Sequence, residues 1–296
     1  MTTAGATEEM IAVSVIIPHF NQAALLEKCL ASLARQTLLQ GAFEVIVADN
    51  GTPGGIGALI ERHSGVRFVE ATARGAANAR NEALRHARGS AIAFIDADCV
   101  AAPDWLQCGL EALNEADLVG GRIIVTVEDE RRPSPVEAFE QVFAFRQRDY
   151  VEKKNFSATA NLFVRRKAAL AIGPFTNGLS EDVDWCRRAR ALGFHLAFND
   201  KSRVSHPARR DWSELIRKWD RIVAERWTGF EGRGLARKAR WLALAAATAM
   251  SAGPHLARVL TSAELKSVRD RKAAALVLAR IRWWRARRMA SLLRAG

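Results

Sequence analysis

The sequence predicts an α/β protein with a mostly parallel sheet and helices on both faces, followed by a helical, basic C-terminal extension. In the first 200 residues, short apolar runs rich in β-branched residues alternate with segments whose apolar residues recur at helical spacing. From Trp212 onward the pattern is helical almost to the end of the chain. We therefore expect two domains, residues 1–211 and residues 212–296.

The alternation of strands and helices is regular up to Asn114. Four strands are predicted, at Val13–Ile17, Phe43–Ala48, Val66–Val69 and Ala91–Ile95. Four helices are predicted, at Ala23–Ala34, Ile56–His63, Ala76–His86 and Pro103–Asn114. Strands connected through helices in this way lie parallel, and such sheets bind ligands at the carboxyl ends of their strands.

The alternation of predicted strands and helices is less regular after Asn114. We expect one or two strands in Leu118–Val127 and another at Ala160–Val164. Helices are expected at Pro135–Tyr150, which is amphipathic, at Arg166–Ile172 and at Glu181–Leu192. Gly173-Pro174 and Gly193 follow the last two helices, where proline stops a helix and glycine permits a left-handed cap.

The cysteines and the N-terminus favour a cytoplasmic protein. Cys29, Cys99, Cys108 and Cys186 lack the spacing of a zinc site or a dense disulfide framework. The first thirteen residues carry acids where a secretory signal needs basic residues, and their apolar run is too short for a signal core.

Positive charge is concentrated in the C-terminal third of the chain. Residues 201–296 contain 23 Lys and Arg against 7 Asp and Glu, and six of the eight tryptophans. Tryptophan with basic residues is typical of the membrane interface, so we expect contact with the cytoplasmic face of the inner membrane and no nucleic-acid partner. A solvated basic face is the alternative. Trp241–Ala257 lacks charge but is short for a membrane span.

Three aspartates follow predicted strands. Asp49 comes directly after Phe43–Ala48, and Asp96 and Asp98 follow Ala91–Ile95. Because these strand ends meet at one edge of the sheet, their carboxylates can share a Mg²⁺ or Mn²⁺ ion with a diphosphate. Each could instead be a turn former or a helix cap. The first strand is followed by no dinucleotide glycine fingerprint and no phosphate-binding lysine loop, which excludes those sites there.

Six motifs in order resemble the family 2 inverting glycosyltransferases, over about residues 12–206. They are VSVIIPHFN at 13–21, EVIVADNG at 44–51, GAANARNEALRHAR at 75–88, AFIDAD at 93–98, TANLFVRR at 159–166 and EDVDWCRRARALGF at 181–194. The resemblance implies the GT-A fold and a divalent metal. It also implies transfer of a sugar from a nucleotide diphosphate sugar to an acceptor hydroxyl, with inversion by one in-line displacement.

The resemblance also implies roles for individual residues. Asp182 would be the catalytic base beside Glu181, although acids in a first helical turn are favoured by the helix dipole whatever their function. Asp98 would bind the metal with His206. Five residues would bind the nucleotide sugar: Asp49 at the base, Asp96 near the ribose, Arg80 beside the nucleotide, and Pro18 and Asn21.

The sequence departs from the processive synthases of this family. Arg226-Trp227 is present, but Val223 occupies the position of the glutamine in their Gln-x-x-Arg-Trp motif. We therefore expect a transferase that adds one or a few sugars. The resemblance further implies a leaning to a UDP-sugar donor and a glycan or lipid-linked acceptor in bacterial polysaccharide or glycolipid assembly. A haloacid-dehalogenase-like phosphatase, whose Asp-x-Asp lies on the first strand, and an inactive nucleotide-sugar-binding scaffold are the alternatives.

Overall fold

The computed structural model describes residues 11–178 and 180–294, and these form two compact units. The first unit comprises the chain up to Ile124 together with Arg146–His206. The second comprises Val125–Phe145 and the chain from Pro207. Most of the N-terminal segment in which we expected no secretory signal lies outside the described residues.

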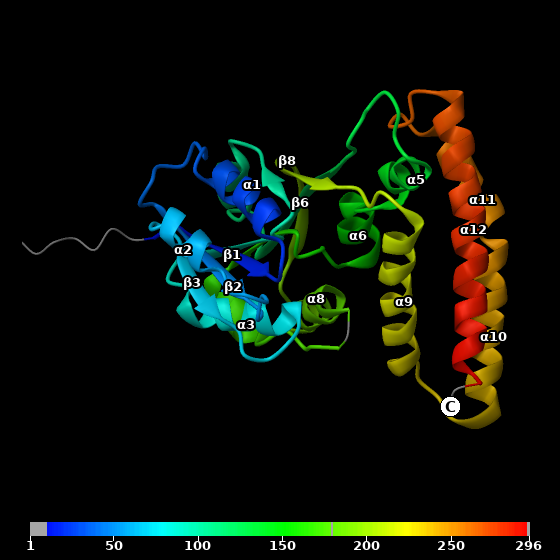
Figure 1. Cartoon of the computed structure of the whole chain (residues 1–296). Coiled ribbons are helices and arrows are strands. Elements are labelled where there is room, and N and C mark those ends of the chain that lie inside the picture. Colours follow the sequence, from blue (N-terminus) through cyan, green and yellow to red (C-terminus); the bar gives the residue numbers. More distant parts are fainter. Residues whose placement is uncertain (1–10, 179, 295–296) are drawn as a thin grey trace, which may run out of the picture. The chain divides into compact units, whose positions relative to one another are not determined.

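An eight-stranded sheet organises the first unit, in the order β3-β2-β1-β4-β7-β6-β8-β5 (Figure 1). The strands are β1 Val13–His19, β2 Phe43–Asp49, β3 Arg67–Glu70, β4 Ala91–Ile95, β5 Val100–Ala101, β6 Leu118–Thr126, β7 Asn161–Arg165 and β8 Leu196–Pro207. Strand β1 pairs in parallel with β2 and β4, and β2 with β3. Antiparallel pairs join β7 to β4 and β6, and β5 to β8. The predicted parallel arrangement thus describes the first half of the sheet.

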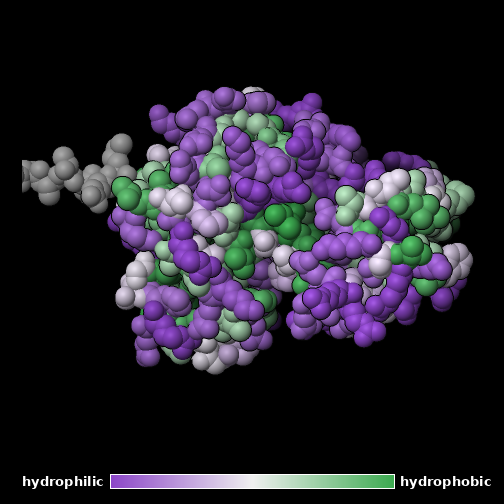
Figure 2. Space-filling model, turned by 90° about the horizontal axis from the view of Figure 1, so that it is seen from above, coloured by the Kyte–Doolittle hydropathy of each residue, from purple (hydrophilic) through white to green (hydrophobic). Residues whose placement is uncertain are grey.

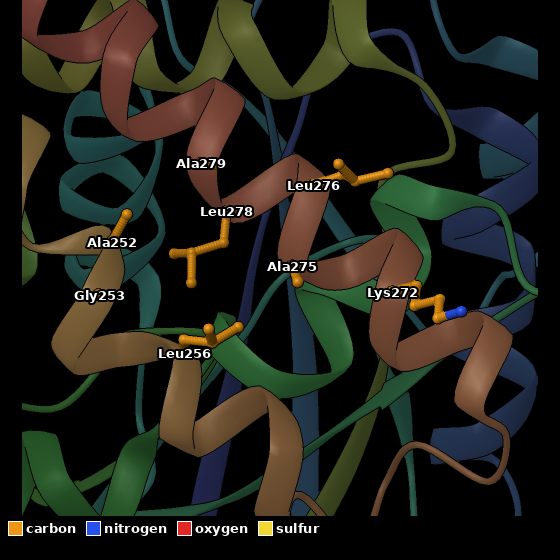
Figure 3. Close-up of a pocket in the computed structure, with 8 residues that line it drawn as sticks. All are labelled: Ala252, Gly253, Leu256, Lys272, Ala275, Leu276, Leu278 and Ala279. Atoms are coloured by element: carbon orange, nitrogen blue, oxygen red, sulfur yellow. The ribbon is translucent and has the colours of Figure 1, made fainter.

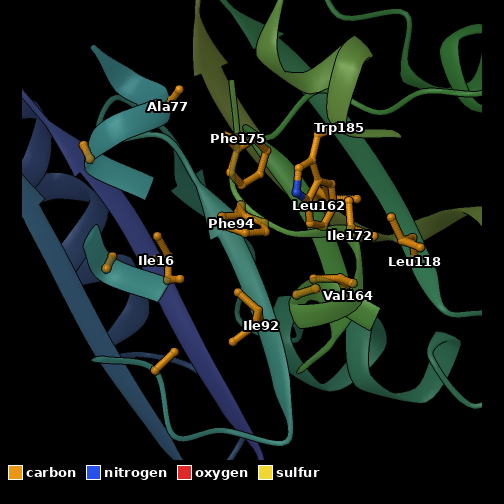
Figure 4. Packing of buried hydrophobic residues seen from close by; sticks show 14 of the residues in the cluster. Ile16, Ala77, Ile92, Phe94, Leu118, Leu162, Val164, Ile172, Phe175 and Trp185 are labelled. Carbon is orange, nitrogen blue, oxygen red and sulfur yellow. The ribbon is translucent and has the colours of Figure 1, made fainter. Parts of the chain in front are cut away.

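Helices cover both faces of this sheet (Figure 1). They are α1 Ala23–Leu33, α2 Gly57–Arg62, α3 Ala76–His86, α4 Trp105–Ala112, α6 Gln147–Lys154, α7 Arg166–Ile172 and α8 Glu181–Ala191. Small and apolar residues of α3, α7 and α8 pack on β-strand side chains such as Ile92 and Phe94, and form one buried cluster (Figure 4). The α/β fold class predicted from the sequence is confirmed.

Trp185 anchors helix α8 in that cluster. Its ring is fully buried, stacks on Phe175 with a centroid distance of 4.8 Å and meets Phe94 edge-on at 6.1 Å (Figure 4). Its indole Nε1 donates to the carbonyl of Gly173 at 2.9 Å. An aromatic ring with its polar atom satisfied is a strong packing anchor. The first turn of α8, one turn away from Trp185, is therefore held in a defined place.

Two sequence predictions need correction. The helix expected at Pro135–Tyr150 is two helices, α5 Pro135–Phe143 and α6, because the backbone turns into the left-handed region at Phe145, with φ of 46°. The apolar periodicity continues through this break, so the pattern did not reveal it. Strand β8 was not expected, because polar residues interrupt its alternation at 199–203.

The second unit is helical. Besides α5 it contains α9 Trp212–Thr228, α10 Gly234–Met250, α11 Ala252–Thr261 and α12 Val268–Leu292. Apolar residues of α5, α9, α11 and α12 form its main core. In the same unit, the buried carboxylate of Glu140 pairs with Arg209 at 3.0 Å and with Lys218 at 3.1 Å. The uncharged segment at Trp241–Ala257 is divided between α10 and α11, and none of the described helices is both long and apolar enough to span a bilayer.

Candidate active site

Asp49, the last residue of β2, accepts three hydrogen bonds from nearby groups. His19 Nδ1 lies 2.8 Å from Oδ1, and Thr52 donates its hydroxyl to Oδ1 at 2.5 Å and its amide to Oδ2 at 3.0 Å. Burial opposes ionisation, but these Thr52 and His19 contacts hold the pKa of Asp49 below its ordinary value. Asp49 is therefore a fixed, ionised carboxylate at the carboxyl end of its strand.

Arg80, on helix α3, joins two other predicted site residues. Its Nη2 donates to Asp96 Oδ1 at 2.8 Å and its Nη1 donates to Glu181 Oε1 at 3.1 Å. The guanidinium is almost fully buried, and although burial opposes its charge, the two carboxylates raise the pKa of Arg80 above its ordinary value. This bridge connects the loop after β4 with the first turn of α8.

Asp182 follows Glu181 at the start of α8 and has a different electrostatic environment. Its Oδ1 accepts the amide of Val183 at 2.8 Å. Burial, and next the charge of Glu181, raise the pKa of Asp182 to about 6, against the opposing effects of the Val183 amide and Arg80. A carboxylate of this kind takes up a proton near neutral pH.

Asp98 and His206 lie close together, as the sequence predicts. His206 Nε2, on β8, is 3.3 Å from Asp98 Oδ2. The Cys99 thiol completes a group of three potential ligand atoms within 4.8 Å of one another. Burial, together with the charges of Asp96 and Asp98, raises the pKa of Cys99 well above its ordinary value, so the thiol stays protonated. A carboxylate and an imidazole remain, which suits a hard divalent ion that also binds phosphate oxygens.

Pro18 and Asn21 lie beside the Asp49 group. Pro18 pairs with Ala48 in the β1–β2 register. Asn21 has φ of 51°, a conformation that asparagine tolerates, and its amide donates to the Thr52 hydroxyl at 2.9 Å.

Two residues that bond to Asp49, His19 and Thr52, were not predicted from the sequence. His19 lies opposite Asp49 in the β1–β2 register, so a correct strand pairing would have revealed their contact. Thr52 lies three residues after Asp49, in a glycine-rich turn at residues 51–55. In the structure this turn holds the carboxylate.

The comparison with family models identifies one match. The model described as glycosyl transferase family 2 matches residues 14–173, which include all the strand-end aspartates and Arg80. Curated relatives of the chain are also named as glycosyltransferases. Glycosyltransferase AglE of Haloferax volcanii is 32% identical over 219 residues, 71% of this chain and 71% of its own length. The pre-mycofactocin glycosyltransferase of Mycobacterium tuberculosis is 28% identical over 68% of this chain and 44% of its own length.

A solved structure has the same fold. The mannosyltransferase PcManGT from Pyrobaculum calidifontis, solved in complex with GDP-Man and Mn²⁺, superposes with a TM-score of 0.60 at 20% identity. The match covers 96% of this chain and 86% of that one. The chain therefore has a GT-A-type fold, which is followed by C-terminal helices.

Proposed function

Because this chain belongs to glycosyltransferase family 2, we propose that it moves one sugar at a time from a nucleoside diphosphate sugar to an acceptor hydroxyl, with inversion at the anomeric carbon. The observation that carries the proposal is the Arg80 bridge. It connects Asp96, on the proposed donor side, to the helix that presents Asp182. The proposed donor site and the proposed base thereby belong to one compact unit.

The proposed donor site uses the strand ends. Asp49 would accept hydrogen bonds from the base, and Asp96 would bind the ribose hydroxyls. Both Nη atoms of Arg80 already bond to carboxylates, so we assign Arg80 to positioning Asp96 and Glu181 rather than to direct phosphate binding. Pro18 and Asn21 would border the nucleotide beside Asp49. We propose uridine as the base, with guanosine as the rival because PcManGT was solved with GDP-Man.

The donor atoms of Asp98 and His206 fit a divalent metal. One carboxylate and one imidazole leave coordination positions for diphosphate oxygens, and divalent ions at phosphate-transfer sites usually combine few protein ligands with substrate phosphates. When bound, the ion offsets the negative charge that develops on the departing diphosphate. The Mn²⁺ in the PcManGT complex supports this assignment.

Asp182 would act as the base. The acceptor oxygen attacks the anomeric carbon, the bond from that carbon to the diphosphate oxygen breaks with its electron pair leaving on the diphosphate, and the hydroxyl proton passes to the Asp182 carboxylate. A pKa of about 6 suits this role, because the group is ionised at pH 7 yet basic enough to take the proton. Glu181, bonded to Arg80, would orient the turn. The phosphatase alternative is not favoured, because the family model spans the Asp-x-Asp motif.

We propose an anionic membrane surface as the partner of residues 212–296 and a glycan or lipid-linked acceptor in polysaccharide or glycolipid assembly. Apolar side chains gather on the C-terminal helices beside hydrophilic ones (Figure 2). A groove of about 470 Å³ lies between α11 and α12, where Leu256 and Leu278 face each other (Figure 3). Leu276, which lines this groove, is 72% exposed, and two turns further along α12 Trp283 is 63% exposed.

The positive charge of these helices is complementary to an anionic bilayer, which supports a membrane as the binding partner of this surface. Residues 232–296 contain 15 Lys and Arg against 2 Asp and Glu, and Lys272 lines the groove itself. Aliphatic and aromatic side chains with basic neighbours enter the headgroup region of anionic membranes. Attachment at the cytoplasmic face of the inner membrane would place these helices at a lipid-linked acceptor.

The metal assignment predicts that nucleoside diphosphate binding depends on a divalent cation and on Asp98. Calorimetry with UDP and with GDP should give binding in Mn²⁺ and at least about tenfold weaker binding in EDTA or in Asp98→Asn, because the diphosphate loses its shared ion. Asp200→Asn, an exposed aspartate of the same unit, is the control and should bind normally. Equal affinity with and without metal would contradict the site.

The base assignment predicts that Asp182→Asn lowers the transfer rate about 10²–10⁴-fold, since an amide cannot take the proton. Nucleotide affinity should stay within about twofold, because the proposed donor contacts are elsewhere. In the wild type, kcat/KM should fall as pH drops below about 6, where Asp182 becomes protonated. Initial rates across pH 5–8 measure this.

Glu181→Gln is the matched control and should retain more activity than Asp182→Asn. Stability provides a second check on folding. Because the folded pKa of Asp182 is raised, its ionisation costs stability as pH rises through 6, so Asp182→Asn should unfold at a higher temperature than wild type at pH 8 but not at pH 4. If Asp182→Asn keeps near-normal turnover while Glu181→Gln is inactive, then the base is Glu181.

The membrane proposal predicts that the full chain cosediments with vesicles containing 30% phosphatidylglycerol far more than with pure phosphatidylcholine. Replacing Leu276 and Trp283 together with glutamine should reduce this binding about tenfold by removing exposed apolar surface. Leu170→Gln, at a 65% exposed leucine of α7, is the control. Binding that is unchanged in the double variant would exclude this face.

A further inference from the structure

Arg285, on helix α12, is a buried cation that lacks an anionic partner among the described residues. Its side chain is 9% exposed and stacks on Trp219 of α9, with Cζ 3.7 Å from the ring centroid. Its Nε and the Nε1 of Trp219 are both buried without a hydrogen-bond acceptor in the part of the chain that is described. Two orphaned donors therefore lie side by side in the second unit.

Two further arginines lie near Arg285, the half-buried Arg282 of the same helix and the exposed Arg226 of α9. Burial, and then the charges of Arg282 and Arg226, lower the pKa of Arg285 to about 9. No hydrogen bond or ion pair joins the side chain of any of the three arginines to another described residue. Their neighbour Arg288 differs, because it pairs with Asp220.

This arrangement is unusual for a folded protein. Buried polar groups are normally hydrogen-bonded, and a buried charge is normally paired, because an unpaired one loses its hydration without compensation. Three guanidinium groups that repel one another and two orphaned N–H donors would all be satisfied by the same thing, a group with several negatively charged oxygens.

We propose that Arg285, Arg282 and Arg226, with the indole N–H of Trp219, bind a phosphoryl group between α9 and α12. Guanidinium groups present paired donors that match phosphate oxygens, and stacking on Trp219 holds the Arg285 plane in place. The phosphoryl group could belong to a phospholipid headgroup or to a soluble phosphate or diphosphate. This site is formed by the second unit alone and does not depend on the proposed sugar transfer.

The test is calorimetric titration of the full chain with inorganic pyrophosphate in EDTA, where the metal-dependent donor site does not contribute. Wild type should bind, and Arg285→Gln should bind at least about tenfold more weakly. Arg280→Gln is the matched control, because Arg280 also stacks on a tryptophan between α12 and α9, with Cζ 3.9 Å from the Trp212 ring centroid, but is exposed. Equal affinity in the two variants, or no binding by wild type, would overturn the proposal.

Thermal unfolding without phosphate shows whether Arg285→Gln folds, and we expect a higher midpoint than wild type, since an unpaired buried charge is removed. Pyrophosphate should then raise the midpoint of wild type and of Arg280→Gln but not of Arg285→Gln. Vesicles of phosphatidylcholine with 20% phosphatidic acid identify the source. Weaker vesicle binding by Arg285→Gln assigns the site to a lipid headgroup, and a loss confined to pyrophosphate assigns it to a soluble phosphate.

Discussion

The Arg80 bridge is the interaction on which the site depends. Asp96 and Glu181 are 85 residues apart in the chain, and the single guanidinium between them joins the loop after β4 to helix α8. The Arg80 guanidinium is almost fully buried, whereas the Asp96 and Glu181 carboxylates are partly exposed, so the buried cation depends on both of them. Removing one partner of such a group is costly, because it leaves buried charge uncompensated. The fold thus connects the proposed donor side and the proposed base through one side chain.

The same arrangement gives the neighbouring carboxylates different chemistry. Glu181 is paired with Arg80, whereas Asp182 bonds to the Val183 amide, and its burial raises its pKa to about 6. Two adjacent acids whose environments differ in this way suit the separate roles that we propose for them, orienting the turn and accepting a proton. Trp185 is stacked on Phe175 in the core and fixes helix α8, which carries both Glu181 and Asp182, so the two acids keep their different environments.

Much of the first unit could be predicted because its helices and strands are determined by residues that are close together in the sequence. The limits of Ala76–His86 follow from helical periodicity, those of Ala91–Ile95 follow from a continuous apolar run, and the aspartates at strand ends follow from parallel topology. Contacts that depend on three-dimensional pairing could not be predicted. His19 contacts Asp49 because the two residues are opposite each other in the β1–β2 register. Arg80 bonds to Glu181, which lies 101 residues further along the chain. The backbone breaks at Phe145, although the apolar pattern continues through it.

Hydrogen exchange tests the central role of Arg80 most directly. If its bridge holds both sides of the site, Arg80→Met should accelerate exchange in the loop at 96–99 and in the first turn of α8, while Arg85→Met, an exposed position on the same helix α3, should change neither. Exchange in both segments that is the same in Arg80→Met as in the wild type would contradict the account.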